Sequence, residues 1–420
     1  MDDLARGRVR ATQDTFQIPE IQKVLTPKRP AVETAGLADI FPYYAGFSFD
    51  WARDLLAKDQ ANASTPITVL DPWNGSGTTT LAAQSLGFRS VGIDRNPIAN
   101  IVARLRCGIM SSDSIKEAPS AGPGESSEGD PLRAWFTDQT SARIRQWVDI
   151  ASDGNGAFSP PYIVSLFRVV RSLTKKFEGS NPTWVKRAKG PDDLIGLDSD
   201  YLDDLIQAEY RFLVGRIETW PVQTTDSLHI TASATRMPIA SSTVDVILTS
   251  PPYLTRIDYA VAYARELAVL GIDIARDRSL RSELMGTTLI RKDVGFSISS
   301  VGPTAQLLLS QVQGHKSKAS SGYYLKQAQQ YLSDLCSGLD EISRVSRPGA
   351  SIHLVVQDSY YKDVPVPLAD ICIEEGTLRG WSLEACDRFP VRRSLTALNT
   401  SARAYKKSDV AESVISFRKD

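Results

Sequence analysis

The sequence predicts an α/β fold in which a mostly parallel sheet ends in an antiparallel hairpin and carries a mainly helical insertion. Between residues 35 and 110, helical and strand patterns alternate on both sides of a glycine turn, which is the order of a βαβ unit. From 131 to 220, apolar residues recur every three or four positions, as they do in amphipathic helices. Residues 381–391 and 412–419 have the pattern of two strands joined by a polar, basic loop, which predicts an antiparallel hairpin at the sheet edge.

The order of these patterns divides the chain into an N-terminal arm, a core in two parts and an insertion. Strand patterns at 228–234, 244–250 and 351–356 restore the α/β alternation after the helical stretch. A run rich in Ser, Gly, Pro and Glu follows Met110 and has the composition of an exposed linker. We therefore expect the arm at 1–34, the core at 35–110 and 222–420, the mainly helical insertion at 111–221, and a lid or recognition segment at 254–326.

Composition narrows the class of protein. The 420 residues include 48 basic and 49 acidic side chains, so any nucleic-acid contact must come from a local patch. No run of 18 apolar residues is present and no apolar signal core follows the first ten residues, so we expect a cytoplasmic protein without a membrane partner. The four cysteines lack C-x-x-C spacing and the three histidines are isolated, which predicts neither a disulfide framework nor a metal site.

A glycine turn after the first core strand predicts a cofactor site. The run from Val69 to Thr79 contains Asp71, Gly75 and Gly77 between a strand and a helix, where α/β proteins bind ligands. Asp94 ends the next strand 23 positions after Asp71, close to the spacing at which an acidic side chain reaches ribose hydroxyls. The turn lacks the third glycine of a dinucleotide site and the lysine of a phosphate loop, and Asp71 suits an ammonium group better than a phosphate. These features favour S-adenosylmethionine as the ligand.

A second loop predicts the chemistry. Strand 244–248 runs into Thr249, Ser250, Pro251, Pro252 and Tyr253, and the two prolines make this loop stiff. The Ser250 hydroxyl and the Pro251 carbonyl could accept hydrogen bonds from an exocyclic amino group and orient it for attack on a methyl donor. Tyr253 could stack on a base removed from its helix.

The two loops together resemble those of the amino-methyltransferases, which carry a D-x-F-x-G-x-G cofactor motif and an [SND]-P-P-[YFW] catalytic motif. The S-P-P-Y version is similar to that of the N4-cytosine DNA methyltransferases. The resemblance implies a Rossmann-like class I methyltransferase sheet and transfer of a methyl group from S-adenosylmethionine to N4 of cytosine in DNA. It implies a catalytic loop of Ser250, Pro251, Pro252 and Tyr253, and a cofactor site made by Phe41, Tyr43, Asp71, Trp73, Gly75, Gly77, Asp94 and Ser233.

Other activities share the same loop chemistry. N6-adenine methylation of DNA, N2-guanine methylation of RNA and a non-catalytic nucleic-acid-binding subunit of a defence complex are the alternatives. A cytosine-C5 enzyme is disfavoured because its chemistry needs a cysteine attached to a proline, and none of the four cysteines follows one. We expect DNA as the partner ahead of RNA, with a cognate endonuclease or defence-system subunits as further partners.

Two basic groups are candidates for holding the polynucleotide. Between residues 165 and 190 the sequence contains seven basic residues and a tryptophan but a single acidic residue, which is typical of a phosphate-binding surface. A solvated helix face whose charge is balanced by the acidic residues of 192–204 explains the same pattern. A second basic group lies in the loop of the terminal hairpin. The predicted contacts are Arg168, Arg171, Lys175, Lys176, Trp184, Lys186, Arg187, Arg392 and Arg393.

Overall fold

A computed structural model describes residues 26–29, 34–44, 46–60, 66–108, 117–119, 126–152, 158–179, 184–220, 225–254, 257–292, 295–391 and 410–420. The arm at 1–34, the linker after Met110 and the basic loop of the terminal hairpin therefore lie mostly or wholly outside the described residues. No helix in the described ranges could span a membrane.

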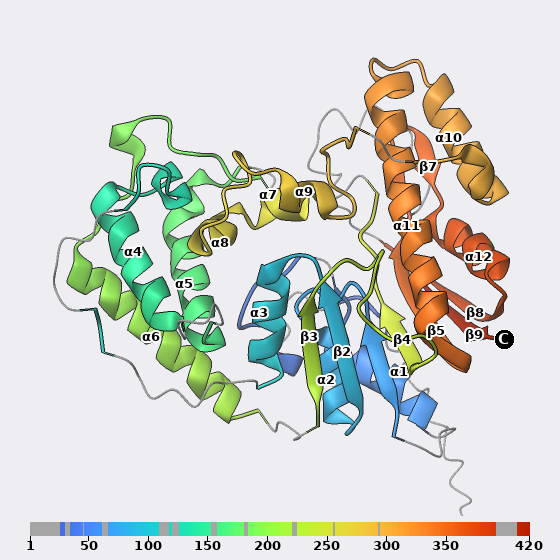
Figure 1. The fold of residues 1–420 in the computed structure, drawn as a ribbon, viewed down its shortest axis with the longest axis horizontal. Helices are drawn as coiled ribbons and strands as arrows, with labels where there is room; N and C mark the ends of the chain where they lie inside the picture. The colour runs from blue at the N-terminus through green and yellow to red at the C-terminus, as the bar shows by residue number, and fades with distance from the viewer. Residues whose placement is uncertain are drawn as a thin grey trace, which may run out of the picture.

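A seven-stranded sheet forms the centre of the molecule (Figure 1). Its order is β3-β2-β1-β4-β5-β9-β8, and the first five of these strands are parallel while β9 pairs antiparallel with β5 and β8. This arrangement confirms the predicted class I methyltransferase sheet with its terminal antiparallel hairpin. The strands are β1 (Thr68–Asp71), β2 (Arg89–Asp94), β3 (Ser227–Thr231), β4 (Val244–Thr249), β5 (Ser346–Gln357), β8 (Trp381–Pro390) and β9 (Ala411–Lys419).

Helices cover both faces of the sheet because its central strands are apolar on both sides. Val69 of β1 packs with α1 (Phe49–Gln60) and α2 (Thr78–Ser85), whereas its neighbour Leu70 faces the other apolar cluster. Successive residues of a strand point to opposite faces, so this alternation produces a three-layer structure. The opposite layer is built from α10 (Pro303–Gly314), α11 (Leu325–Val345) and α12 (Leu368–Leu378).

The predicted helical insertion is present as α4 (Asp138–Ala151), α5 (Pro160–Leu173) and α6 (Ser199–Glu218). Its apolar residues form one continuous core with α3 (Pro97–Arg106) and with the short helices α7 (Tyr259–Ala262) and α8 (Ala264–Val269). Inside the insertion, the rings of Tyr162 and Tyr210 stack with centroids 4.1 Å apart. The insertion is therefore joined to the methyltransferase core and has no separate core of its own.

The segment predicted as a single lid or recognition unit, 254–326, divides between two parts of the molecule. Its first part contains α7, α8 and α9 (Ser279–Glu283), and apolar residues of this part share the core of the helical insertion. Its second part contains α10, which packs against α11, α12 and a small hairpin of β6 (Ser359–Tyr361) and β7 (Val364–Val366). Figure 1 shows the two parts on opposite sides of the upper end of the sheet.

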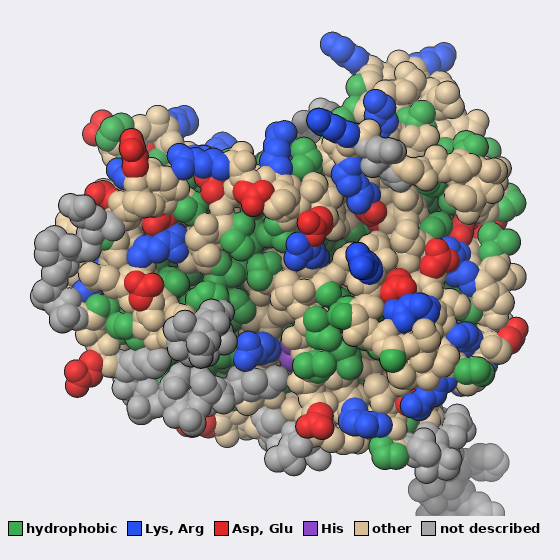
Figure 2. All heavy atoms as spheres, in the orientation of Figure 1, with side chains coloured by type: hydrophobic (Ala, Val, Ile, Leu, Met, Phe, Trp, Pro, Cys, Tyr) green, Lys and Arg blue, Asp and Glu red, His purple; other side chains and the backbone are tan. Residues whose placement is uncertain are grey.

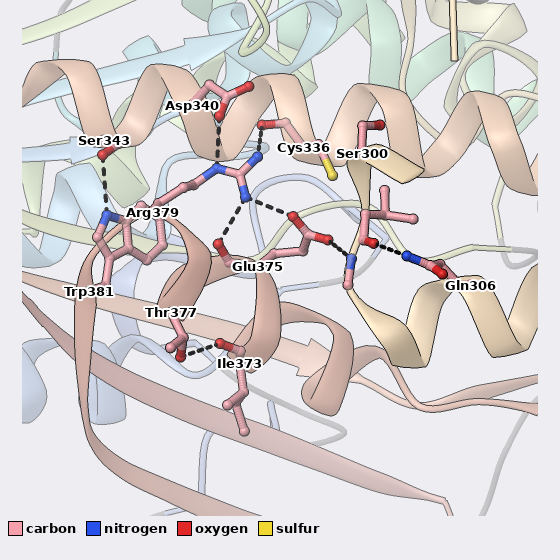
Figure 3. A network of polar contacts seen from close by, with 12 residues as sticks. Ser300, Gln306, Cys336, Asp340, Ser343, Ile373, Glu375, Thr377, Arg379 and Trp381 are labelled. Carbon is pink, nitrogen blue, oxygen red and sulfur yellow. Dashed lines mark hydrogen bonds and ion pairs between the residues drawn. The ribbon is translucent and has the colours of Figure 1, made fainter. Parts of the chain in front are cut away.

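A buried polar network fixes α10 to this second part (Figure 3). The Glu375 carboxylate accepts a hydrogen bond from the Gly302 backbone N–H at 2.8 Å and pairs with Arg379 at 2.7 Å. The Arg379 guanidinium also pairs with Asp340 of α11 at 2.8 Å. Since Glu375 is almost fully buried, its charge needs both partners, and the network ties the start of α10 to α11 and α12.

The remaining short helical turns are η1 (Ala35–Leu37), η2 (Pro131–Ala134), η3 (Thr174–Phe177), η4 (Pro191–Asp193), η5 (Ile298–Ser300) and η6 (Ser320–Tyr324).

Candidate active site

A cavity of about 320 Å³ lies at the carboxyl ends of β1, β2 and β4. This edge is where open α/β sheets bind ligands. One side, which we call the glycine-turn wall, comes from the loops after β1 and β2. The other side, the α9–α11 wall, comes from the loop after β4, from α9 and the residues that follow it, and from α11. Of the predicted site residues, the cavity is lined by Tyr43, Asp71, Trp73, Gly75, Asp94, Ser233, Ser250 and Pro252.

Asp71 connects the two motifs predicted from the sequence. Its carboxylate accepts hydrogen bonds from the Thr79 hydroxyl at 2.6 Å, the Thr249 hydroxyl at 2.5 Å and the Trp73 backbone N–H at 3.1 Å. Burial raises the pKa of Asp71 to about 6, and the three donors oppose that shift. Thr79 lies in the first turn of α2, directly after the glycine turn, and Thr249 precedes Ser250. One buried carboxylate therefore joins the cofactor loop to the catalytic loop.

The glycine turn approaches its neighbours too closely for any side chain. Gly77 has a φ of +82°, and a Cβ there would lie 2.7 Å from the Cβ of Ala103 on α3. Gly75 donates its backbone N–H to Asp94 at 2.9 Å, and the Asn96 N–H donates to the other carboxylate oxygen at 2.8 Å. Burial raises the pKa of Asp94 to about 6, against the effect of these two donors. Gly77 shapes the turn from outside the cavity lining.

A side-chain contact that the sequence analysis missed supports this turn from behind. The Asn74 side chain lies 3.3 Å from Nδ1 of His229 on β3, and it occupies the space above Gly92 where a Cβ would lie 2.4 Å from its Cγ. Burial lowers the pKa of His229 to about 4, so this imidazole is neutral near pH 7. His229 is thus a structural partner of the glycine turn. The only feature of His229 visible in the sequence is its place in a strand pattern, which does not predict this contact.

Aromatic rings close one end of the cavity. Tyr43 stacks on Tyr263 with ring centroids 4.9 Å apart, and burial raises the pKa of both hydroxyls well above the ordinary value. Tyr259, which the sequence analysis did not single out, lines the cavity beside Tyr43. Phe41 is buried between Phe167 and Tyr263 and does not line the cavity, so the structure places it in the aromatic core.

The Ser-Pro-Pro-Tyr loop is held from both sides. The Ser250 and Tyr253 hydroxyls lie 3.1 Å apart. Tyr331 of α11 donates its hydroxyl to the Pro252 carbonyl at 2.9 Å, and Ser359 donates to the Leu254 carbonyl at 3.2 Å. Ser250 and Pro252 line the cavity, whereas Pro251 is buried and Tyr253 packs against the apolar cluster around α11.

Ser233 lines the cavity. Its hydroxyl is 2.8 Å from that of Thr235 and accepts the Thr235 backbone N–H at 3.2 Å. Trp73 also lines the cavity, and its indole lies over Gly338 of α11, where a Cβ would come within 2.6 Å of the ring. No motif in the sequence predicts that Gly338 accommodates this ring.

The α9–α11 wall contains charged residues that the sequence analysis missed. Arg291 pairs with Asp334 of α11 at 2.6 Å, and both line the cavity. Glu283 forms an ion pair with Arg95, which comes from the opposite, glycine-turn wall. These residues belong to none of the motifs in the sequence, and tertiary packing alone brings them to the site.

Two of the predicted nucleic-acid contacts, Arg168 and Arg171, have their charges paired with carboxylates of this chain. Arg171 pairs with the buried Glu266 at 2.6 Å and lies against the ring of Phe41. Arg168 pairs with Glu209 at 2.6 Å and donates to the Ile40 carbonyl. These guanidiniums join α5 to its neighbours, and the periodicity of a helix alone could not separate them from solvent-facing ones.

The other basic residues of this group are exposed. They are Lys175, Lys176, Lys186 and Arg187, and Trp184 beside them is half exposed. Figure 2 shows Lys and Arg side chains along the upper part of the molecule, over the helical insertion, the α7–α9 segment and the α10–α11 part. The exposed basic residues on the last two parts include Arg276, Arg278, Lys292, Lys316, Lys318 and Lys326. Arg392 and Arg393 lie outside the described residues.

The residues at the cavity fit S-adenosylmethionine. The cofactor carries positive charge and ribose hydroxyls, and the glycine-turn wall offers the two carboxylates Asp71 and Asp94. Gly75 leaves open the space in front of Tyr43, because a Cβ there would lie 3.0 Å from the ring. In the described ranges, no group of three or more His, Cys, Asp or Glu side chains is arranged to hold a metal ion.

Comparison with known proteins gives the chain's relatives. It is 24% identical over 287 residues to the Type II methyltransferase M.BsoBI of Geobacillus stearothermophilus, and 23% identical over 281 residues to M.AvaI of Anabaena variabilis. These matches cover 60% of this chain, and 56% and 58% of the relatives. Its relatives are Type II methyltransferases. The chain thus spans little more than half the length of the relatives it matches, and no family model matches it.

Solved structures with a similar arrangement include a SAM-dependent methyltransferase from Methanosarcina mazei and the rRNA methyltransferase AviRa from Streptomyces viridochromogenes. They are 9% and 13% identical, cover 86% and 94% of this chain and 95% and 96% of their own chains, and each has a TM-score of 0.30. At these scores the fold assignment depends on the sheet order described above. The class I methyltransferase sheet and the Type II relatives imply S-adenosylmethionine as the cofactor.

Proposed function

We propose that the protein transfers a methyl group from S-adenosylmethionine to the exocyclic N4 amino group of cytosine in DNA. The observation that carries this proposal is a single cavity lined by Asp71, Gly75 and Asp94 on one side and by Ser250 and Pro252 on the other. A ribose-bearing methyl donor and an amino group could therefore meet there. The Type II methyltransferase relatives support DNA as the substrate, and a cognate endonuclease is a proposed partner.

In this proposal each wall holds one reactant. When bound, S-adenosylmethionine would supply an electrophilic methyl group and leave as S-adenosylhomocysteine, while the methylated amino nitrogen would lose one proton to solvent. Asp94 would accept hydrogen bonds from the ribose, and Asp71 and the rings of Tyr43 and Trp73 line the cavity around the remainder. Ser250 and the Pro251 carbonyl accept the hydrogens of the target amino group, which directs the nitrogen lone pair away from the base ring. The contact with Tyr253 fixes the Ser250 hydroxyl for this role.

The test is incubation with methyl-labelled S-adenosylmethionine and mixed DNA, with RNA in parallel, followed by mass spectrometry of the nucleosides. We expect label in N4-methylcytosine from DNA, and its loss in Ser250→Ala and Tyr253→Ala. Tyr253→Phe keeps the ring and removes the hydroxyl next to Ser250, so it separates packing from the contact with Ser250. Label in N6-methyladenine or in an RNA guanine would keep the chemistry and change the substrate. Cofactor binding without transfer to any nucleic acid would identify a non-catalytic subunit instead.

DNA would lie across the upper face that carries the exposed basic side chains. The Lys186 and Arg187 side chains project from the helical insertion, and Arg187 lies 3.4 Å from Asp273 of the segment after α8. Replacing either by Ala should weaken DNA binding to all sequences and lower the slope of log K against log salt by about one. Arg211→Ala on α6 removes one exposed charge whose guanidinium donates to Gln207 and serves as the control for net charge. Salt slopes equal to that of the wild type in both Lys186→Ala and Arg187→Ala would show that these two residues lie outside the binding surface.

A further inference from the structure

An arginine that lines the cavity on the α9–α11 wall has a buried hydrogen-bond donor without an acceptor among the described residues. Arg291 lines the cavity and donates one Nη2 hydrogen to Asp334 at 2.6 Å. Its Nε is buried, and no acceptor lies within reach of it among the described residues. A buried guanidinium N–H without an acceptor destabilises the protein. This arrangement therefore suits an arginine whose missing acceptor is supplied by a bound ligand.

Helix α11 fixes the position of this arginine. Gln330, Asp334 and Gly338 are spaced four apart and therefore lie on one face of the helix. Gln330 accepts the Arg291 backbone N–H at 2.9 Å and donates to the Leu289 carbonyl at 3.1 Å, which holds the loop that carries Arg291. Gly338 lies under Trp73, and the neighbouring Tyr331 supports the catalytic loop. On α11, Asp334 thus lies between Tyr331, which bonds the catalytic loop, and Gly338, which contacts the Trp73 ring of the cofactor loop.

We propose that Arg291 reads the acceptor edge of the target base and that Asp334 positions it. This inference rests on the proposed function and adds the residue that selects the base. Cytosine presents two adjacent acceptors, its ring N3 and its carbonyl O2, beside the amino group that Ser250 and Pro251 would hold. The planar guanidinium of Arg291 offers adjacent donors to both. On the same edge as its amino group and ring N1, adenine presents a hydrogen-bearing carbon in place of the second acceptor, so it would leave one of these donors unpaired in the site.

The experiment combines a change in the protein with a change in the base. A DNA duplex is made with the sequence in which the wild-type protein methylates cytosine, and a second duplex carries 3-deazacytosine there, which keeps the amino group and O2 but lacks the N3 acceptor. The variants are Arg291→Lys, which keeps the charge and loses the planar fork, and Asp334→Asn. Arg418→Lys is the matched control, because Arg418 pairs with Glu384 at 3.0 Å beside the start of β5, at the opposite edge of the sheet. Turnover on both duplexes and binding of S-adenosylmethionine are measured for each protein.

We expect Arg291→Lys to lower kcat/KM on cytosine DNA by about 5- to 150-fold, the usual range for a bidentate contact, while Arg418→Lys leaves it unchanged. Removal of N3 should slow the wild type strongly and slow Arg291→Lys little further, with Asp334→Asn in between. Affinity for S-adenosylmethionine should stay within twofold in all variants. If Arg291→Lys fails to fold, the loss of turnover on removing N3 is compared between the wild type and Asp334→Asn, and a smaller loss in Asp334→Asn supports the inference.

Three results would overturn the inference. Equal sensitivity to N3 in wild type and variants would show that Arg291 does not face that atom. Loss of cofactor affinity in Arg291→Lys by the same factor as the loss of turnover would place Arg291 in the cofactor site. Transfer by the wild type to an adenine amino group would overturn this inference and leave amino-methyl transfer intact, whereas no transfer to any base would end the proposed function itself.

Discussion

The two walls of the cavity are held by different kinds of contact. On the glycine-turn wall, Asp94 bonds the backbone of Gly75 and Asn96, residues within about 20 positions of it in the chain. On the α9–α11 wall, Arg291 pairs with Asp334, 43 positions away, and Glu283 pairs with Arg95, 188 positions away. The first wall is therefore built mainly by local backbone geometry, and the second exists only when distant helices pack together.

The largest effect should come from the turn itself. Gly77→Ala places a Cβ 2.7 Å from that of Ala103, whereas Gly87→Ala has a similar φ of +76° and no atom within 4 Å of the new Cβ. The left-handed conformation should cost each variant about 1–2 kcal/mol of unfolding free energy. The overlap should cost Gly77→Ala about 1–3 kcal/mol more and abolish cofactor binding. Urea unfolding and calorimetric titration with S-adenosylmethionine measure both. Equal stability of the two variants would mean that α3 does not shape the turn.

The next effect concerns the Asp94 carboxylate. Asp94→Asn removes a charged acceptor and should weaken binding of S-adenosylmethionine by about ten- to a hundredfold, since hydrogen bonds to charged groups contribute about 1.5–3 kcal/mol. Calorimetric titration at pH 7.5 gives this ratio. An unchanged Kd would remove Asp94 from the cofactor site.

The same carboxylates predict a pH dependence. Burial raises the pKa values of Asp71 and Asp94 from 3.8 to about 6, so both gain a proton as the pH falls through 6. The charged forms bind the cationic cofactor, and affinity should therefore be full above pH 7 and decrease toward pH 5. In the free protein the sign is opposite: the native state binds more protons than the unfolded chain between about pH 4 and 6, so its stability falls as the pH rises through that window. Affinity in Asp94→Asn should vary less with pH. A flat wild-type profile from pH 5 to 8 would contradict the assignment.

Gly338→Ala tests the junction between the walls. In an exposed helix, replacing Gly by Ala stabilises by about 1 kcal/mol, which is the expectation for Gly215→Ala on α6, where no atom lies within 4 Å of the new Cβ. At Gly338 the Cβ would overlap the Trp73 ring at 2.6 Å, so this gain should be lost and cofactor binding should weaken several-fold. Thermal unfolding and quenching of tryptophan fluorescence by the cofactor report on the two effects. A stabilised Gly338→Ala with unchanged binding would show that Trp73 moves freely.

The smallest effect belongs to the ion pair that joins the walls. Arg95 and Glu283 are one third and nearly one half exposed. A double-mutant cycle with Arg95→Gln and Glu283→Gln should give a coupling energy of about 0.2–1 kcal/mol in urea unfolding, decreasing with added salt. A coupling above that range, insensitive to salt, would mean that the walls are held together more rigidly than their surface contacts indicate.

Most of the fold could be predicted because its signals are periodic and local. The alternation around Asp71 and Asp94 marked β1, α2 and β2, and the apolar spacing of 131–220 marked α4, α5 and α6. The sequence did not predict that the two parts of 254–326 bury their apolar faces against different neighbours. Residue spacing predicts that a helix has an apolar face, but it does not predict which element packs against that face.

The candidate site divides in the same way. By itself the sequence predicted the glycine turn, Asp71, Asp94 and the Ser-Pro-Pro-Tyr loop, because the residue types and spacing that mark them lie within short stretches of chain. Only the tertiary structure decided that Arg171 pairs with the buried Glu266 and that Arg291 and Asp334 line the cavity. The physical reason is that the use of a charge depends on which carboxylate or solvent surrounds it after folding, and the chain reaches those neighbours only when distant elements pack around the sheet.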